Sequence, residues 1–182
     1  MPLISDDYRA LNRELHDTAP TYGSHGARWA EHVQTVAHMM NSTSILDYGC
    51  GKGTLAAAVP LPIREYDPSV EGKDEPPAPA DLVVCTDVLE HIEPEFLGDV
   101  LSHLQQLTRR VAFFTIHCGP AGKFLPDGRN AHLSQHPMQW WIDQINRRFV
   151  IGQLQIIDTH TLWMLARSLD EHERIMREGL RA

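Results

Sequence analysis

Short apolar runs, typical of buried strands, alternate along this chain with segments whose apolar residues recur every three or four positions, as on one face of a helix. Most of the runs are bounded by turn-forming residues such as Gly, Pro and Asp. The strand-like runs are SILDY (44–48), LPIREYD (61–67), DLVVCT (81–86), RVAFFTIH (110–117), FVIGQLQII (149–157) and HTLWMLARS (160–168).

Helices are predicted from the apolar spacing and from capping residues. Ser5, followed by two acids, is a typical N-cap for a first helix. Pro137 suits the first turn of another. A short helix is expected between the glycines at 49–53 and Pro60, and a charged surface helix from Leu169. The apolar positions of the other helices are Tyr8, Leu11 and Leu15; Trp29, Val33, Val36, Ala37 and Met40; Phe96, Leu97, Val100, Leu101, Leu104 and Leu107; and Met138, Trp141, Ile142 and Ile145.

This alternation predicts an α/β fold with a doubly wound, mostly parallel sheet, closed by an antiparallel C-terminal hairpin. The 182 residues are expected to form one domain. Its parts are an N-terminal helical segment (1–41), a core (42–168) and a C-terminal helix (169–182). Ligands of such sheets bind beyond the carboxyl ends of the strands. The places to examine are therefore Asp47–Gly53, Asp67, Asp87–His91 and the segment from His117.

Composition and charge say little about the fold, but they limit the partners that the chain is expected to bind. The net charge of −8 disfavours binding along a nucleic-acid backbone, although a nucleotide or a strand terminus stays open. No apolar run approaches the ~20 residues of a membrane span, and the first residues lack a signal-peptide profile. The three cysteines are widely spaced, which fits a reducing compartment. We expect a cytoplasmic protein without a membrane partner.

A glycine-rich turn follows the first strand-like run. In LDYGCGKG (46–53), Asp47 is followed by Gly49, Gly51 and Gly53 at alternate positions. Glycines let the backbone approach a ligand closely. The spacing differs from the G-x-G-x-x-G of dinucleotide sites, and Lys52 precedes Gly where a phosphate-binding loop needs Ser or Thr. The turn is either a cofactor site of another kind or a purely structural turn.

Three motifs together resemble the class I S-adenosylmethionine-dependent methyltransferases, over about residues 42–167: ILDYGCGKGTLA, an acid in REYDPS and ADLVVCTDVLEHI. The resemblance implies a Rossmann-like fold and S-adenosylmethionine as cofactor. It further implies that Asp47, Gly49, Gly51 and Gly53 surround the amino-acid moiety of the cofactor, with Asp87 against it. Asp67 would hold the ribose hydroxyls, because a carboxylate can accept two O–H bonds from a diol.

The chain departs from this family after Asp67. The family normally places a helix and a further strand there, and that strand supplies a polar group to adenine. The thirteen Pro-rich residues between Asp67 and Asp81 cannot hold both elements. The sheet is therefore expected to be trimmed between its second and fourth strands. Asp74, Glu75 or backbone amides would then contact adenine.

Asp87, Glu90 and His91 in DVLEHI form the other candidate site. Their offsets place them on one side of a first helical turn. Many metal-free methyltransferases carry a similar LEH sequence, so Glu90 and His91 could be helix-start and packing residues. The alternative is that they are metal ligands, completed by His132 from the loop after His117.

The metal interpretation rests on resemblance to two O-methylating groups, the small-RNA 3′-terminal 2′-O-methyltransferases and the ubiquinone-pathway catechol O-methyltransferases. The first position here is Asp87 rather than Glu. Two carboxylates and imidazole nitrogens would suit Mg²⁺, Mn²⁺ or Zn²⁺. A bound cation could orient a diol and lower its pKa, with a histidine accepting the proton. Without a metal, His91, His117 or His132 could act as the base.

We therefore expect an S-adenosylmethionine-dependent methyltransferase that O-methylates a small polar or sugar/nucleotide-like acceptor, with or without Mg or Mn. Arg129, Asn130 and Tyr22 are the candidates for substrate contact. Methylation of a nucleic-acid terminus or base is one alternative, for which Lys123, Arg129, Arg147 and Arg148 supply cations. A non-catalytic cofactor-binding subunit of a complex is another.

Overall fold

A six-stranded sheet with the order β2-β1-β3-β4-β6-β5 organises the computed structural model, which describes residues 2–179. The first four of its strands are parallel, β6 runs antiparallel to β4, and β5 antiparallel to β6. This confirms the mostly parallel sheet with an antiparallel C-terminal hairpin. The strands are β1 (Ile45–Tyr48), β2 (Ile63–Tyr66), β3 (Ala80–Thr86), β4 (Thr108–His117), β5 (Phe149–Ile156) and β6 (Thr161–Ser168).

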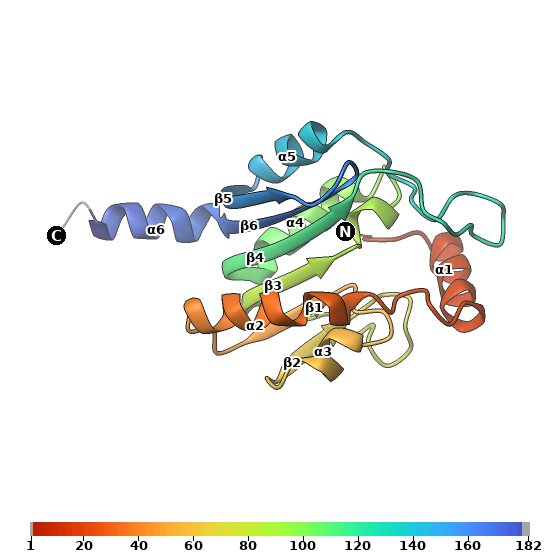
Figure 1. Cartoon of the computed structure of the whole chain (residues 1–182), viewed down its shortest axis with the longest axis horizontal. Coiled ribbons are helices and arrows are strands. Elements are labelled where there is room, and N and C mark those ends of the chain that lie inside the picture. Colours follow the sequence, from red (N-terminus) through yellow and green to blue (C-terminus); the bar gives the residue numbers. More distant parts are fainter. Residues whose placement is uncertain (1, 180–182) are drawn as a thin grey trace.

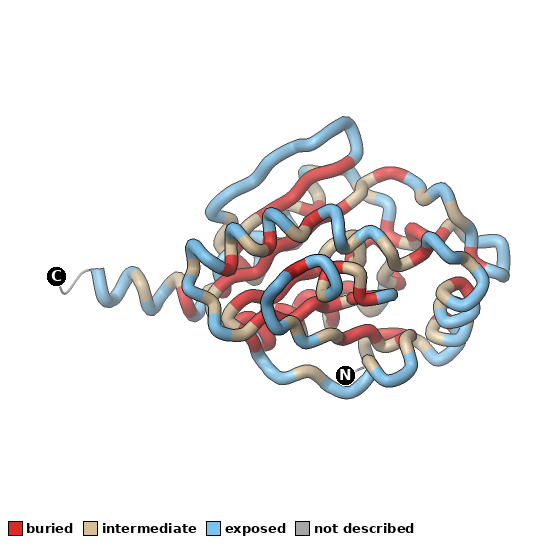
Figure 2. Tube along the Cα trace, turned by 60° about the horizontal axis from the view of Figure 1, so that its bottom comes forward, coloured by how far each residue is buried: buried red, intermediate tan, exposed pale blue. Residues whose placement is uncertain are grey.

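Helices cover both faces of this sheet (Figure 1). On one face, α4 (Leu97–Leu107) and α5 (Met138–Asn146) pack against a core cluster that includes Trp141 and Phe114. On the other face, η1 (Gly26–Trp29), α2 (Ala30–Met39) and α3 (Thr54–Ala58) pack around Trp29 and Phe113. Adjacent residues of β4 thus serve opposite cores, as the period of two requires. Figure 2 shows the buried residues gathered along these central strands.

Beyond the carboxyl ends of the parallel strands stand α1 (Asp6–Thr18) and the loop 118–136 (Figure 1). The predicted N-cap is present, because the Ser5 side chain accepts a hydrogen bond from the Tyr8 backbone N–H at 3.1 Å. A third core cluster joins Tyr8 and Leu15 of α1 to Leu125 and Ala131 of the loop. The first helix and this loop therefore form one cap over the edge where ligands are expected.

The trimmed segment is as predicted. β2 is the edge strand, and residues 67–79, described throughout, contain only turns and bends before β3 begins. Three prolines at 76, 77 and 79 remove backbone donors that a further strand would need.

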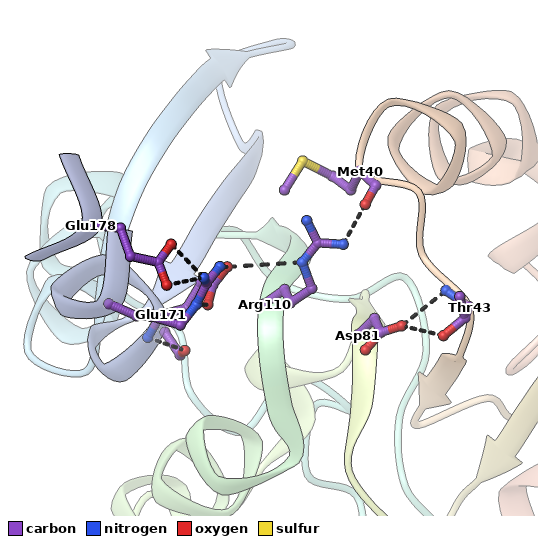
Figure 3. Close-up of polar contacts among 8 residues, drawn as sticks. Met40, Thr43, Asp81, Arg110, Glu171 and Glu178 are labelled. Carbon is purple, nitrogen blue, oxygen red and sulfur yellow. Dashed lines mark hydrogen bonds and ion pairs between the residues drawn. The ribbon is translucent and has the colours of Figure 1, made fainter. Parts of the chain in front are cut away.

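Polar contacts tie the peripheral helices to the opposite end of the sheet (Figure 3). Arg110 of β4 donates to the Met40 carbonyl at the end of α2 and lies 3.8 Å from the Glu171 carboxylate. Glu171 belongs to α6 (Leu169–Gly179), the predicted C-terminal helix. Its predicted residues 180–182 lie outside the described part of the chain. No helix among residues 2–179 is long and apolar enough to cross a membrane.

Candidate active site

The glycine turn after β1 has a backbone that only glycine adopts readily. The φ angles of Gly49, Gly51 and Gly53 are +76°, +49° and +72°. A Cβ on Gly49 would lie 2.4 Å from a methyl carbon of Val88, and one on Gly51 would lie 2.6 Å from the Gly23 carbonyl oxygen. The turn is therefore closed against the segment before η1 on one side and the end of β3 on the other.

Two buried carboxylates flank this turn. Asp67, at the end of β2, accepts hydrogen bonds from the backbone N–H of Gly51 at 3.0 Å and of Ser69 at 2.9 Å. A carboxylate has about four acceptor positions, so two remain for a diol. Burial, followed by the nearby Glu65 charge, raises the pKa of Asp47 to about 7. A cation brought to the turn would therefore stabilise the ionised form of Asp47.

A cavity of about 460 Å³ opens along the turn. Gly49, Gly51, Asp47, Asp67 and Asp87, the residues predicted to contact the cofactor, all line it. Gly53 does not; it caps α3 and packs against Glu65 and Lys73. The remaining walls come from the inner face of α1, the segment 21–28, the end of β3 and the loop after β4.

Asp87 directly follows β3 and takes a left-handed conformation, with φ at +56°. Its Oδ1 accepts from the Thr115 hydroxyl at 3.1 Å, and its Oδ2 accepts from Arg28 at 2.7 Å. Because Asp87 turns the chain, the next residues form the 3-10 turn η2 (Leu89–His91) rather than an α-helix. The expected single helical face carrying Asp87, Glu90 and His91 is therefore wrong.

Glu90 is completely buried and contributes to the wall of the cavity. Its Oε1 accepts from the His117 backbone N–H at 2.8 Å, while Oε2 has no hydrogen-bond partner among the described residues. Burial, followed by repulsion from Asp87, raises the pKa of Glu90 to about 8. Glu90 is accordingly neutral below that pH.

His91 and His132 form the polar corner of the cavity. Their rings meet edge to face with centroids 4.6 Å apart. Nδ1 of His91 lies 2.8 Å from the Ala131 carbonyl oxygen, and Nδ1 of His132 lies 2.7 Å from that of Gly119. A carbonyl only accepts, so both Nδ1 atoms carry the proton and both Nε2 atoms keep a lone pair. Burial, then His132, lowers the pKa of His91 to about 3, and burial also lowers the pKa of His132.

These contacts do not fit a metal site. Asp87 is bonded to Arg28 and Thr115, and Glu90 to a backbone amide. Among residues 2–179, no three His, Cys, Asp or Glu side chains are arranged to hold a metal ion. The predicted ligand set of Asp87, Glu90, His91 and His132 therefore finds no support in the structure, and neither does Mg or Mn.

The predicted substrate residues separate into two groups. Tyr22 is buried, lines the cavity and donates from its hydroxyl to Asn12 at 2.8 Å. Arg129 is exposed and pairs with Asp127 at 2.7 Å, and Asn130 bonds to the Ala121 backbone within the loop. Neither Arg129 nor Asn130 lines the cavity, because both stabilise the loop itself.

Apart from Tyr22, sequence reasoning missed the contribution of the first thirty residues to the cavity. Asn12 and His16 lie one turn apart on the inner face of α1, and Arg28 reaches Asp87 from η1. The i, i+4 spacing of polar residues beside Tyr8 was a usable signal for α1. No such signal exists for Arg28, because only the fold brings this residue to the end of β3.

The buried Glu90 predicts a pH-dependent stability. Its folded pKa lies above the ordinary value of 4.5, so the folded state binds more protons between pH 4.5 and 8 and loses stability as pH rises through that window. Glu90→Gln stays neutral at every pH. Thermal scans measure the melting temperature of the variant minus that of the wild type at two pH values. We expect this difference to be larger at pH 8.5 than at pH 5.5 by about 5 °C. An equal difference at both pH values, as expected for the exposed control Glu95→Gln, would contradict this account.

Comparison with known proteins adds to this geometry. Residues 6–169 match the family model described as a methyltransferase domain. No curated protein sequence matches the chain significantly.

Several solved structures are similar in fold. The 1,6-didemethyltoxoflavin-N1-methyltransferase of Burkholderia thailandensis, with bound 1,6-didemethyltoxoflavin and S-adenosylhomocysteine, covers 92% of this chain and 92% of its own, with 17% identity and a TM-score of 0.66. Magnesium protoporphyrin IX methyltransferase from Synechocystis PCC 6803, with bound SAM, aligns over 92% of this chain and 100% of its own, with 16% identity and a TM-score of 0.62. The N-methyltransferase NodS from Bradyrhizobium japonicum WM9, in complex with S-adenosylhomocysteine, covers 91% and 100%, with 15% identity and a TM-score of 0.58.

Proposed function

This chain belongs to the methyltransferase-domain family and is an S-adenosylmethionine-dependent methyltransferase, and from that premise we propose that it transfers the sulfonium methyl group to a hydroxyl of a small polar acceptor of a sugar- or nucleotide-like kind. The observation that carries the proposal is the corner formed by His91 and His132. Both residues line the cavity that contains the glycine turn, and both are neutral with Nε2 free to accept a proton.

The donor would lie along the glycine turn. The backbone of Gly49 and Gly51 and the carboxylate of Asp47 surround its amino-acid moiety, and Asp67 accepts from its ribose hydroxyls. Arg28, which lines the same cavity, is the cation available to its carboxylate. All three places adjoin one continuous space, so one elongated ligand can occupy them together.

Methyl transfer from a sulfonium is an in-line displacement, so the protein chiefly supplies proximity and alignment. The acceptor oxygen forms a bond to the methyl carbon while the carbon–sulfur bond breaks and its electrons return to sulfur. Bond formation turns the acceptor oxygen into an oxonium, whose proton is acidic enough to pass to the imidazole Nε2 of His91 even though the pKa of that imidazole is lowered to about 3. His132 lies beside it. We favour a hydroxyl acceptor because a hydroxyl must lose its proton during the transfer, and this corner offers a proton acceptor. No step uses a metal ion.

The size of the cavity favours a small acceptor. Its 460 Å³ lies in the lower part of the range of about 300–1,000 Å³ typical of sites for a single small ligand, and it must hold donor and acceptor side by side. Of the four cations considered for nucleic-acid binding, only Lys123 lines it. Arg147 and Arg148 lie at the C-terminal end of α5, so we do not propose a nucleic-acid substrate.

Isotope transfer tests this proposal. Protein with methyl-labelled S-adenosylmethionine is incubated with separate panels of hydroxylated metabolites, nucleosides, amines and oligonucleotides, and products are identified by mass spectrometry. Label on the oxygen of a small acceptor supports the proposal. Label on nitrogen, or only on oligonucleotides, contradicts the acceptor class. Tight binding of S-adenosylhomocysteine with no transfer in any panel would favour a non-catalytic subunit.

The buried Asp47 predicts a pH-dependent cofactor affinity. Below its pKa of about 7, the carboxyl group is neutral and must release a proton before it can stabilise the ammonium of the donor. The affinity for S-adenosylhomocysteine should therefore decrease as the pH is lowered, by up to about tenfold for each pH unit below pH 7. Calorimetry at pH 8, 7 and 6 measures this. Asp47→Asn should bind more weakly at pH 8 and lose most of the dependence; an unchanged dependence in Asp47→Asn would assign it to another group.

A further inference from the structure

The cavity has an apolar end that neither the acceptor corner nor the glycine turn explains. It is lined by Leu3, Val88, Ile92 and Val100. We propose that residues 2–5, here called the N-terminal strap, form one wall of the subsite that holds the adenine base of the cofactor. The proposal rests on the proposed use of S-adenosylmethionine and assigns a part of its site that the trimmed fold leaves without a wall.

The segment expected to contact adenine is not available for it. None of residues 70–79, all of which the structure describes, lines the cavity. Asp74 and Glu75 are exposed. The prediction that either of them substitutes for the missing strand is therefore wrong, and another part of the chain must cover the base.

The apolar end lies on the side of the sheet where the base is expected. Leu3, Val88 and Ile92 pack against the core cluster that contains Tyr66 and Val100. Tyr66 is the last residue of β2 and precedes Asp67, the proposed ribose ligand. Ile4 of the strap packs with Tyr22 and Ala131 in a different cluster near the acceptor corner, so Leu3 is the strap residue on the side of Tyr66. A donor with its amino-acid moiety at the glycine turn and its ribose on Asp67 would thus direct its base toward Leu3.

The strap is held in place by a buried acid. Both carboxylate oxygens of Glu93 accept hydrogen bonds from Ser5, at 2.9 Å from the backbone N–H and 2.6 Å from the hydroxyl. Glu93 follows η2, and the Tyr8 hydroxyl donates to the His91 carbonyl oxygen at 2.8 Å. Glu93 also lies at the N-terminus of α1, where a negative charge is stabilised by the helix dipole. These contacts hold the strap and the start of α1 against the segment that follows β3.

The helix that follows the strap meets the other loop of the subsite. Asn12 donates to the Ser69 hydroxyl at 3.0 Å, and the Arg13 guanidinium lies 3.4 Å from the Ser69 carbonyl oxygen. Residues 2–13 therefore span from the end of β3 to the loop after Asp67. A flat heteroaromatic base fits between such apolar side chains, which contact its faces rather than its polar edge.

Leu3→Ala tests the proposal, with the exposed Leu61→Ala as a matched control because Leu61 does not line the cavity. Calorimetry is run with two probes, S-adenosylhomocysteine and 5′-methylthioadenosine, which keeps the base and ribose but lacks the amino-acid part. We expect Leu3→Ala to weaken both probes by about tenfold, because part of the apolar wall is removed. Glu93→Gln should weaken both by about threefold, and Leu61→Ala should weaken neither.

The outcomes separate two failures. Wild-type affinity of Leu3→Ala for both probes, or a loss confined to S-adenosylhomocysteine, would overturn the strap as the wall of the base subsite. If wild-type protein bound neither probe, the cofactor itself would be wrong. Should Leu3→Ala melt at a lower temperature, Leu3→Met serves as the second variant; it keeps the apolar volume and should retain affinity within about twofold.

Discussion

Gly51→Ala is expected to weaken the binding of S-adenosylhomocysteine by at least about a hundredfold, equivalent to about 2.7 kcal/mol. The left-handed φ of +49° is unfavourable for alanine, and the new Cβ would lie 2.6 Å from the Gly23 carbonyl oxygen. Backbone is on both sides of this contact, so no side-chain rotation relieves it. The turn and the segment 21–23 must move apart, which displaces the Gly51 amide from Asp67.

The control for this experiment carries the same backbone strain without the contact. Gly128 and Gly72 have φ angles of +88° and +79°, nothing lies within 4 Å of a Cβ built on either, and neither lines the cavity. Gly128→Ala and Gly72→Ala should lose some stability but bind the ligand as wild type does. Wild-type affinity in Gly51→Ala, measured by calorimetry below its melting temperature, would mean that the cofactor does not touch this turn.

His91→Ala is expected to lower kcat by about 10²–10⁴-fold with saturating donor, because it removes the proposed proton acceptor. The affinity for S-adenosylhomocysteine should change by no more than about threefold, since no donor contact is assigned to the imidazole. Single-turnover methylation and calorimetry on the same preparation measure the two quantities. The backbone carbonyl that holds Tyr8 stays in place.

His136→Ala is the matched control for the loss of an imidazole. That ring stacks on Trp140 with centroids 3.7 Å apart and does not line the cavity, so its loss should leave kcat unchanged. His132→Ala should lower kcat by a smaller factor than His91→Ala. A His91→Ala protein that turns over at the wild-type rate would remove His91 from the proton transfer and leave alignment alone as the source of catalysis.

Much of the fold follows from local patterns. Short apolar runs bounded by turn-forming residues predicted the strands, and the thirteen Pro-rich residues between Asp67 and Asp81 correctly predicted a missing strand. The departures are local. Leu89–His91 became a 3-10 turn because Asp87 takes a left-handed conformation, stabilised by Thr115 and Arg28 from distant parts of the chain. The residues around Asp87 in the sequence give no indication of those partners.

The site was predictable only where a motif implies a place on the sheet. Asp47 lies near the end of β1, Gly49, Gly51, Asp67, Asp87 and His91 come shortly after strands, and the cavity brings them together with His132 of the loop after β4. Arg129 and Asn130 were chosen for polarity in a loop, and loop polarity was satisfied within the loop. Leu3 and Glu93 could not be found from sequence, because an apolar residue and an acid far apart in the chain carry no signal until the first helix is placed.

A crystal structure of the protein with S-adenosylhomocysteine measures the central claim most directly. We predict the amino-acid moiety against the backbone of Gly49 and Gly51, both ribose hydroxyls within hydrogen-bond distance of the Asp67 carboxylate, and the sulfur atom facing the His91 ring. Ligand density at any other place, or a cofactor whose sulfur faces away from His91 and His132, would contradict it.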